Sequence, residues 1–129
     1  MAKTNGYLLD TQIFLWWETD DQRLPQQVKN ILVDPGQLLY LSLASVWEIV
    51  IKQQIGKLKL IADLSKIIKQ SYFPLLAIEL NHILALNEIQ NHHKDPFDRL
   101  LISQSQTENL TLITSDKKIA KYDINTLLI

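Results

Sequence analysis

The stretch HKDPFDRLL, residues 93–101, decides how the surrounding chain folds. Two carboxylates, Asp95 and Asp98, lie three residues apart with Pro96 between them, and an apolar run follows. An acid suits the N-cap position of a helix, and a proline suits its first turn, which places the second acid one turn further on. The stretch therefore predicts a helix that begins at two acids and runs to about Asn109.

Three further acids occupy matching points in the chain. Asp10, Glu48 and Asp116 each lie where an apolar, strand-like run gives way to a helix. Ligands of open parallel sheets bind beyond the carboxyl ends of the strands. We therefore expect these three acids at that edge of the sheet, whereas the place of Asp98 depends on how its helix packs.

Strand-like runs alternate with amphipathic helices along the whole chain. This alternation predicts an α/β fold around a central, mostly parallel sheet of four or five strands. The sequence has no repeat and no linker-like segment, so we expect one domain over residues 1–129. The predicted strands are 6–10, 37–42, 74–78, 110–114 and, as an edge strand, 124–128. The predicted helices are 11–18, 25–34, 42–56, 63–71, 81–89, 95–109 and 116–122.

The composition excludes several classes of protein. There are no cysteines, so a disulfide framework and a thiolate metal site are both excluded. No apolar run approaches the roughly 18 residues of a membrane span, and the first residues lack the apolar segment of a signal peptide. We therefore expect a cytoplasmic protein with no membrane partner.

The net charge of -1 hides a division between the four acids and the rest of the chain. Without those four, 10 acidic residues face 13 lysines and arginines, which leaves a charge of +3. If the four acids hold divalent cations, a phosphodiester meets a mildly positive surface. The charge therefore permits nucleic-acid binding without demanding it.

A cluster of carboxylates without lysine or arginine partners suits hard divalent cations, which take oxygen ligands. Mg²⁺ or Mn²⁺ held in this way lowers the pKa of bound water and clamps a phosphodiester for in-line attack. Without metal, such a cluster repels itself and raises the pKa of some of its acids. The four acids together therefore predict a metal site for phosphoryl chemistry.

Each acid also has a purely structural interpretation. Asp10, Asp95 and Asp116 all stand at positions that suit helix N-caps, and the acid three residues after Asp95 favours the helix dipole. The pair Ser45 and Glu48 has the spacing of a capping box. Taken singly, each acid fits capping better than metal binding, and only their conjunction favours a metal site.

Other side chains carry weaker signals. His92 and His93 could ligate a metal, but they lie in a polar linker, where histidines are more often solvated. The tryptophans fit core or dimer contacts better than platforms for nucleobases, and the clustered lysines fit a solvated helix end. The residues concerned are Trp16, Trp17 and Trp47, and Lys52, Lys57 and Lys59.

Four segments occur in an order that resembles one known family. They are LLDT at 8–11, SVWEI at 45–49 followed by Lys52 and by GKL at 56–58, the stretch at 93–101, and TSD at 114–116. Together they resemble the PIN-domain family, and within it the VapC-like toxins of bacterial type II toxin–antitoxin pairs. The resemblance covers residues 7 to 128, and it implies a three-layer α/β/α fold and Mg²⁺- or Mn²⁺-dependent cleavage of RNA.

The resemblance also implies roles for individual residues. The family's acidic quartet, which is both catalytic and metal-binding, maps onto Asp10, Glu48, Asp98 and Asp116. Accessory roles fall to Asp95 as a cap, to Thr114 as a hydroxyl that supports the last acid, and to Arg99, which orients a site carboxylate or contacts a partner. Such toxins commonly form homodimers and are neutralised by a small antitoxin protein that covers the acidic cleft.

Two departures from the family pattern leave the acids untouched. Gln12 stands where this branch often has histidine, and Gln104-Ser105 lies near a stretch that is usually rich in alanine. Both leave the substrate preference open.

We therefore expect a metal-dependent PIN-type endoribonuclease, the toxin of a toxin–antitoxin pair. Two alternatives stay open. A catalytically silent PIN-like binding module would keep the fold and bind a partner through Trp16, Trp17 and the lysines. A phosphatase-type enzyme would use Asp10 as a nucleophile, but such enzymes carry a second acid two residues later, and Gln12 stands there.

Overall fold

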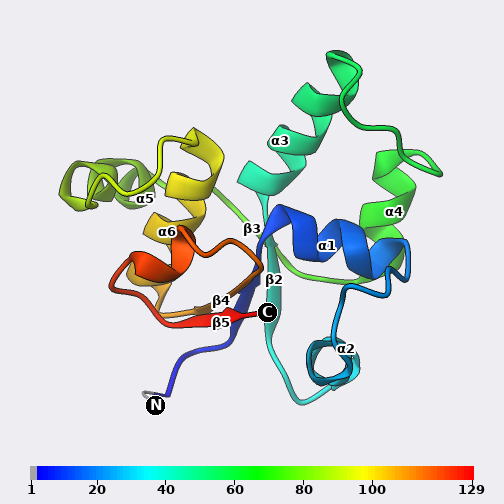
Figure 1. Cartoon of the computed structure of the whole chain (residues 1–129), viewed down its shortest axis with the longest axis horizontal. Helices are drawn as coiled ribbons and strands as arrows, with labels where there is room; N and C mark the ends of the chain where they lie inside the picture. The colour runs from blue at the N-terminus through cyan, green and yellow to red at the C-terminus, as the bar shows by residue number, and fades with distance from the viewer. Residues whose placement is uncertain (1–2) are drawn as a thin grey trace.

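The computed structural model describes residues 3–129 and has a five-stranded sheet at its centre (Figure 1). All neighbouring strands are parallel, in the order β3-β2-β1-β4-β5. The strands are β1 (Tyr7–Leu9), β2 (Leu39–Ser42), β3 (Leu75–Leu76), β4 (Thr111–Thr114) and β5 (Thr126–Leu128). The predicted parallel sheet is confirmed, and the segment near the C-terminus forms its fifth strand.

Six α-helices and two 3₁₀ helices join these strands within residues 3–129. The α-helices are α1 (Thr11–Glu18), α2 (Gln26–Val33), α3 (Leu43–Gln54), α4 (Leu64–Ser71), α5 (Leu80–Leu84) and α6 (Pro96–Glu108). The 3₁₀ helices are η1 (Ala85–Glu88) and η2 (Ile119–Lys121). The helix predicted at 81–89 is therefore divided into α5 and η1, and the one at 116–122 shrinks to η2, because short helices often tighten their turns to 3₁₀ geometry. Over residues 3–129, every helix is too short or too polar to cross a lipid bilayer.

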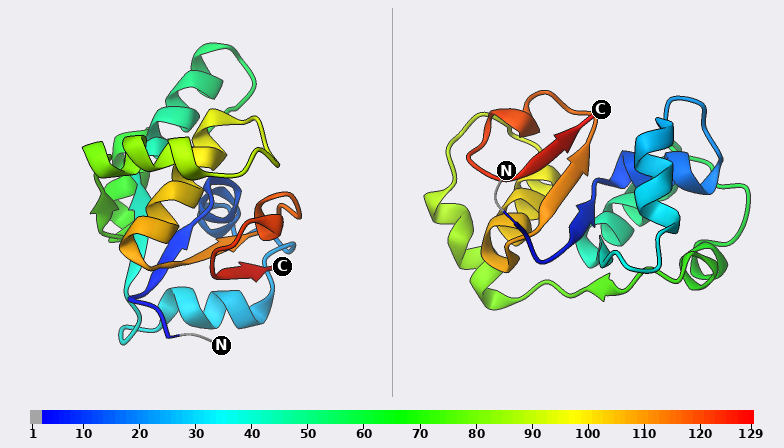
Figure 2. Two further views of the ribbon diagram at one scale, coloured as in Figure 1. Left: turned by 90° about the vertical axis from the view of Figure 1, so that its left-hand side faces the viewer. Right: turned by 90° about the horizontal axis from the view of Figure 1, so that it is seen from below.

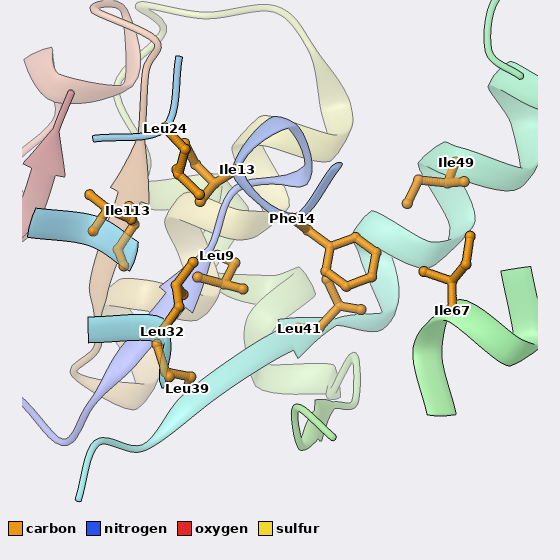
Figure 3. Close-up of a cluster of buried hydrophobic side chains, with 11 residues drawn as sticks. Leu9, Ile13, Phe14, Leu24, Leu32, Leu39, Leu41, Ile49, Ile67 and Ile113 are labelled. Atoms are coloured by element: carbon orange, nitrogen blue, oxygen red, sulfur yellow. The ribbon is translucent and has the colours of Figure 1, made fainter. Parts of the chain in front are cut away.

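Helices cover both faces of the sheet, as the three-layer expectation requires. Leu9 and Ile113 belong to one core, which packs against α1, α2 and α4 (Figure 3). Leu8 and Leu112 alternate with them along the strands and belong to the other core, which packs against α6. Figure 2 shows α5 and α6 on one side of the central strands and α1, α2 and α4 on the other.

One serine and one aspartate set the starts of the two helices that lead to the site. Ser42 Oγ accepts the Ala44 N–H at 3.0 Å, which makes Ser42 the N-cap of α3. Because α3 begins at Leu43, Ser45 and Glu48 lie inside it, and their capping-box spacing does not form a cap. At α6, the Asp95 carboxylate caps the first turn as predicted.

Gln104 ties α6 to both neighbouring layers. Its Oε1 accepts the Ser42 hydroxyl at 2.6 Å, and its amide donates to the Ala77 carbonyl at 3.2 Å. The amide also lies 3.3 Å from Nδ1 of the buried His82. A buried amide needs such partners to offset its lost hydration. The polar residue at this point in α6 therefore has a structural role.

Candidate active site

An open cleft of about 250 Å³ lies beyond the carboxyl ends of β1, β2 and β4. Asp10 follows β1, Glu48 lies on the helix after β2, and Asp116 follows β4, as the strand-end rule predicts. The packing of α6 brings Asp98 to the same place. The cleft is lined by Asp10, Thr11, Gln12, Leu15, Glu48, Lys52, Asp95, Asp98, Ser115 and Asp116.

Asp10 and Glu48 form the more buried part of the cleft, with 6% and 4% of their surfaces exposed. Thr114 Oγ1 donates to Asp10 Oδ2 at 2.6 Å, and Thr11 Oγ1 donates to Glu48 Oε1 at 2.7 Å. Thr11 Oγ1 also donates to Ser45 Oγ at 2.8 Å, so its single hydroxyl proton is shared between the serine oxygen and the carboxylate. Hydroxyl groups thus orient both buried carboxylates.

Asp98 and Asp116 meet His93 in the more exposed part of the site. His93 Nε2 lies 2.7 Å from Asp98 Oδ2 and 3.1 Å from Asp116 Oδ2. Each of the three side chains offers one ligand atom, and these atoms lie within 4.8 Å of one another. Carboxylate oxygens are the donors that Mg²⁺ and Mn²⁺ prefer, so this group fits a divalent ion.

Two acids of the cleft, Asp10 and Asp98, have raised pKa values, as predicted for some acids of a cluster without metal. Burial raises the pKa of Asp10, and the charges of Glu48 and Asp116 raise it further. Burial, followed by the charges of the other acids of the cleft, raises the pKa of Asp98 to about 8. A divalent cation would relieve this repulsion, which is a second reason why the residues fit a metal.

Lys52 contradicts the expectation of acids without a basic partner. Its Nζ lies 2.7 Å from Glu48 Oε2, one turn away on α3. This hydrogen bond raises the pKa of Lys52, so the ammonium stays charged. The spacing of four residues on one helix is a signal that the sequence contains. The cleft is therefore acidic but carries one cation beside Glu48.

Thr114 supports a different acid from the one expected. Its hydroxyl donates to Asp10, on the neighbouring strand's loop. It reaches Asp116 only by accepting the backbone N–H of that residue at 3.0 Å. One threonine therefore links the first and last acids of the quartet.

Within the described residues Arg99 contacts no site carboxylate, so the first of its two expected roles is not observed, and contact with a partner stays a prediction. Its guanidinium donates to the backbone carbonyls of Gln90 at 3.1 Å and His93 at 3.3 Å. A longer contact of 3.5 Å reaches the Leu86 carbonyl. Arg99 therefore holds the segment 86–93 against the start of α6.

Of the three acids that suit helix N-caps by their position in the sequence, Asp95 is the one whose carboxylate caps a helix. Asp95 Oδ1 accepts the N–H groups of Phe97 at 2.9 Å and Asp98 at 3.1 Å. In the described chain the Asp10 carboxylate does not cap α1, although it stands at the N-cap position. The two carboxylate oxygens of Asp116 have different partners. Oδ1 accepts the backbone N–H of Lys118 at 2.9 Å, and Oδ2 faces the imidazole of His93.

His93 is a residue of the site, although its sequence context favours a solvated side chain over a metal ligand. The polar linker predicted a solvated side chain, but 14% of this one is exposed and it contacts two of the acids. The available signal was its place two residues before the N-cap of the helix that carries Asp98. His92 behaves as predicted, with an exposed ring that contacts Gln90.

Residues 7–125 match the family model of the PIN domain. The chain belongs to the PIN domain family. The match covers almost the whole chain and confirms the resemblance carried by the four segments. Among curated proteins, no sequence is significantly similar to this PIN domain.

Solved structures share the fold of this PIN domain at low sequence identity. VapBC2 from Rickettsia felis, bound to a DNA fragment from its promoter, matches with a TM-score of 0.70 and 15% identity over 95% of this chain and 97% of the other. DNA-bound VapBC from Salmonella typhimurium matches with a TM-score of 0.68 and 11% identity over 95% and 96%. A toxin–antitoxin complex from Klebsiella pneumoniae matches with a TM-score of 0.66 and 17% identity over 94% and 95%. At these identities the similarity establishes a VapC-like fold.

Proposed function

We propose that this PIN domain is a Mg²⁺- or Mn²⁺-dependent endoribonuclease that acts in the cytoplasm as the toxin of a type II toxin–antitoxin pair. The observation that carries the proposal is the convergence of four acids from four parts of the chain in one cleft. Their mutual repulsion disfavours a merely structural role, because capping does not require the acids to meet. Gln12 lines the same cleft where a phosphatase would need its second acid.

In the proposed reaction, Asp10, Glu48, Asp98 and Asp116 hold one or two divalent ions. Such ions, when bound, acidify water and neutralise the charge that develops on a phosphodiester. The chain orients the acids beforehand, since threonine hydroxyls fix Asp10 and Glu48 and the cap at the start of α6 fixes Asp98. Lys52 is half-exposed beside Glu48 and is placed to attract the RNA backbone as it enters the cleft.

We propose that the partner of this toxin is a small antitoxin protein. The three solved structures with this fold are all described as toxin–antitoxin or VapBC complexes. The acidic cleft is complementary to a basic side chain of a partner, which would neutralise the cluster and exclude RNA at the same time.

We also propose a homodimer, built on an apolar surface over α3, α5 and the start of α6. Trp47 is 56% exposed and packs edge-to-face on Phe97, with ring centroids 5.1 Å apart. It borders an apolar hollow of about 400 Å³. Leu80, Ile83 and Leu84 on α5 are also exposed. Exposed apolar surface of this kind usually marks an interface.

Trp16 and Trp17, by contrast, are half-buried and pack on the core.

The Trp47→Glu protein is expected to sediment as a monomer under conditions in which the unaltered protein is a dimer, because a buried glutamate would be unpaired at the interface. Sedimentation velocity at several concentrations measures this. Val33 on α2, which is 63% exposed, provides the control, and Val33→Glu should leave the dimer intact. A monomeric unaltered protein at about 100 µM would contradict the proposed dimer.

The proposed activity is tested first by titrating Mn²⁺ into the purified, antitoxin-free protein by calorimetry, with Asp98→Asn run alongside. We expect saturable binding that the variant weakens by about tenfold or more, because the variant lacks a ligand of the group at His93. The same two proteins are then incubated with a mixture of structured and single-stranded RNAs, and cleavage is expected only from the unaltered protein with metal. Equal Mn²⁺ binding by both proteins would contradict the proposed metal site and would leave the acids with structural roles only.

A further inference from the structure

We propose that His93 is a nitrogen ligand of the ion held by Asp98 and Asp116, and that it biases this site towards Mn²⁺ over Mg²⁺. The inference rests on the proposed metal dependence and adds to it a fifth ligand and a metal preference. One of the segments that carry the family resemblance begins at His93, but the resemblance assigns metal binding to the four acids alone. The assignment follows from the geometry of the side chains in the cleft.

The distances around His93 Nε2 suit ligands of one ion. Adjacent ligands of an octahedral ion with bonds of about 2.1 Å lie about 3 Å apart. Nε2 lies 2.7 Å from Asp98 Oδ2 and 3.1 Å from Asp116 Oδ2, values on either side of that spacing. The three ligand atoms come from two different parts of the fold, the start of α6 with its preceding loop and the loop after β4.

The backbone of His93 is held firmly, so the ring is positioned before any ligand arrives. Its N–H donates at 2.8 Å to the hydroxyl of the buried Tyr122, which also accepts the N–H of His92. Its carbonyl accepts the Arg99 guanidinium at 3.3 Å. Positioning of this kind is typical of metal ligands, whose own surroundings fix their orientation. The contacts of Arg99 therefore have a function, because they hold the loop that carries the imidazole.

One contact of the ring must change when Nε2 binds a metal. The Asp95 N–H lies 3.4 Å from His93 Nδ1, which makes Nδ1 the acceptor while Nε2 carries the proton. A hydrogen bond of that length is weak, so its loss costs little beside the gain of a metal bond. The alternative is that the Nε2 proton simply bridges Asp98 and Asp116 in place of a cation. The two roles predict opposite effects of removing the ring.

A nitrogen ligand changes which ion the site prefers. Mg²⁺ is a hard ion that takes oxygen ligands and keeps its water, whereas ions further along the first transition row accept imidazole more readily. Mn²⁺ has the coordination preferences of Mg²⁺ for carboxylates but binds nitrogen better. A site of two carboxylates and one imidazole should therefore discriminate in favour of Mn²⁺, and more so than the four acids alone.

The test compares His93→Ala with His92→Ala as a matched control. Both variants keep the backbone N–H groups that Tyr122 accepts, and the His92 ring contacts Gln90 and Tyr122 rather than the acids. The free Mn²⁺ signal in electron paramagnetic resonance gives the Mn²⁺ affinity, and displacement by MgCl₂ gives that for Mg²⁺. Pulsed measurements on the bound Mn²⁺ report whether a nitrogen is coordinated.

For His93→Ala we expect a loss of Mn²⁺ affinity of about tenfold or more and a loss of Mg²⁺ affinity of less than about threefold. The nitrogen coupling should be present in the unaltered protein and in His92→Ala, and absent in His93→Ala. Unchanged or tighter Mn²⁺ binding by His93→Ala, or an equal loss for both ions, would overturn the assignment. Asp98→Asn distinguishes a failure of this proposal from a failure of the proposed function. If Asp98→Asn loses affinity for both ions while His93→Ala keeps both affinities, the carboxylates bind the metal and His93 is not a ligand.

Discussion

The Asp10→Asn protein is expected to lose RNA cleavage by at least about a thousandfold while its metal-free form becomes more stable than the unaltered protein. Loss of cleavage follows if Asp10 holds the catalytic ion, because an amide is a much poorer ligand than a carboxylate. The gain in stability follows from the surroundings of Asp10. Its carboxylate is 6% exposed and lies near the charges of Glu48 and Asp116, and burial raises its pKa.

The size of the stabilisation is set by one buried charge. Asparagine keeps an oxygen that accepts the Thr114 hydroxyl, so the 2.6 Å hydrogen bond survives. The substitution removes repulsion and the cost of burying a charge, for which we expect a gain of about 1–2 kcal/mol. Urea denaturation in EDTA measures the gain as a higher midpoint at an unchanged slope.

Thr114→Val is the matched variant with the opposite expectation. It leaves the Asp10 carboxylate buried without its hydroxyl donor, which should destabilise the protein by about 1–3 kcal/mol. If Asp10 were merely structural, Asp10→Asn would lower the stability and preserve cleavage. That pair of results would contradict the proposed role of Asp10.

The sheet and most helix boundaries could be predicted because the signals are local. Apolar runs that end in an acid mark β1 and β4, and the Asp95-Pro96 pair marks the start of α6 through a cap that spans three residues. A parallel sheet then brings the ends of its strands to one edge, which places Asp10 and Asp116 together. These steps need only spacing and the rules for caps.

Partners between distant elements could not be predicted, because they depend on packing and rotamers. Thr114 faces Asp10 across two neighbouring parallel strands, although Asp116 is closer in sequence. His93 reaches the acids only because the segment before α6 folds back over the cleft, where Arg99 holds it. Gln104 contacts β2 over a separation of 62 residues. Composition and periodicity contain none of these pairings.

Lys52 shows a different kind of omission. The spacing of Glu48 and Lys52 is the pattern of an ion pair on one helix, and it is visible in the sequence. A lysine near the end of a predicted helix more commonly indicates a solvated helix end. The structure turns that face of α3 into the cleft, so a surface pair becomes part of the site.

Without metal, the unaltered protein is expected to lose stability as the pH rises from about 5 to 8. The pKa of Asp98 is about 8 in the folded protein and near its ordinary value of 3.8 in the unfolded chain. Between these values the folded state holds a proton that the unfolded state has released, so each rise in pH favours unfolding. The contribution is fully present below the unfolded pKa and is lost as the pH passes the folded one. The direction for Asp10 is the same.

The expected loss is on the order of 2–4 kcal/mol, less than the full shift implies, because Asp98 keeps contact with solvent and with His93. Asp21 does not confuse the measurement, since its pKa is lowered to about 2 and its contribution changes only in more acidic solution. The midpoints of urea denaturation in EDTA at about pH 5, 6.5 and 8 give the slope of stability against pH. Asp98→Asn should flatten it, because the variant has no proton to lose at this position.

Saturating Mg²⁺ should reverse the slope. Protons and metal compete for the same carboxylates, so the ion binds more tightly as the pH rises, and binding to the folded state adds about 2.7 kcal/mol when its concentration is a hundred times the dissociation constant. The unaltered protein with Mg²⁺ should therefore be at least as stable at pH 8 as at pH 5, while Asp98→Asn should gain little from the ion. A metal-free stability that stays flat or rises over this range would mean that the acids do not repel one another. The cleft would then have no electrostatic reason to recruit a cation.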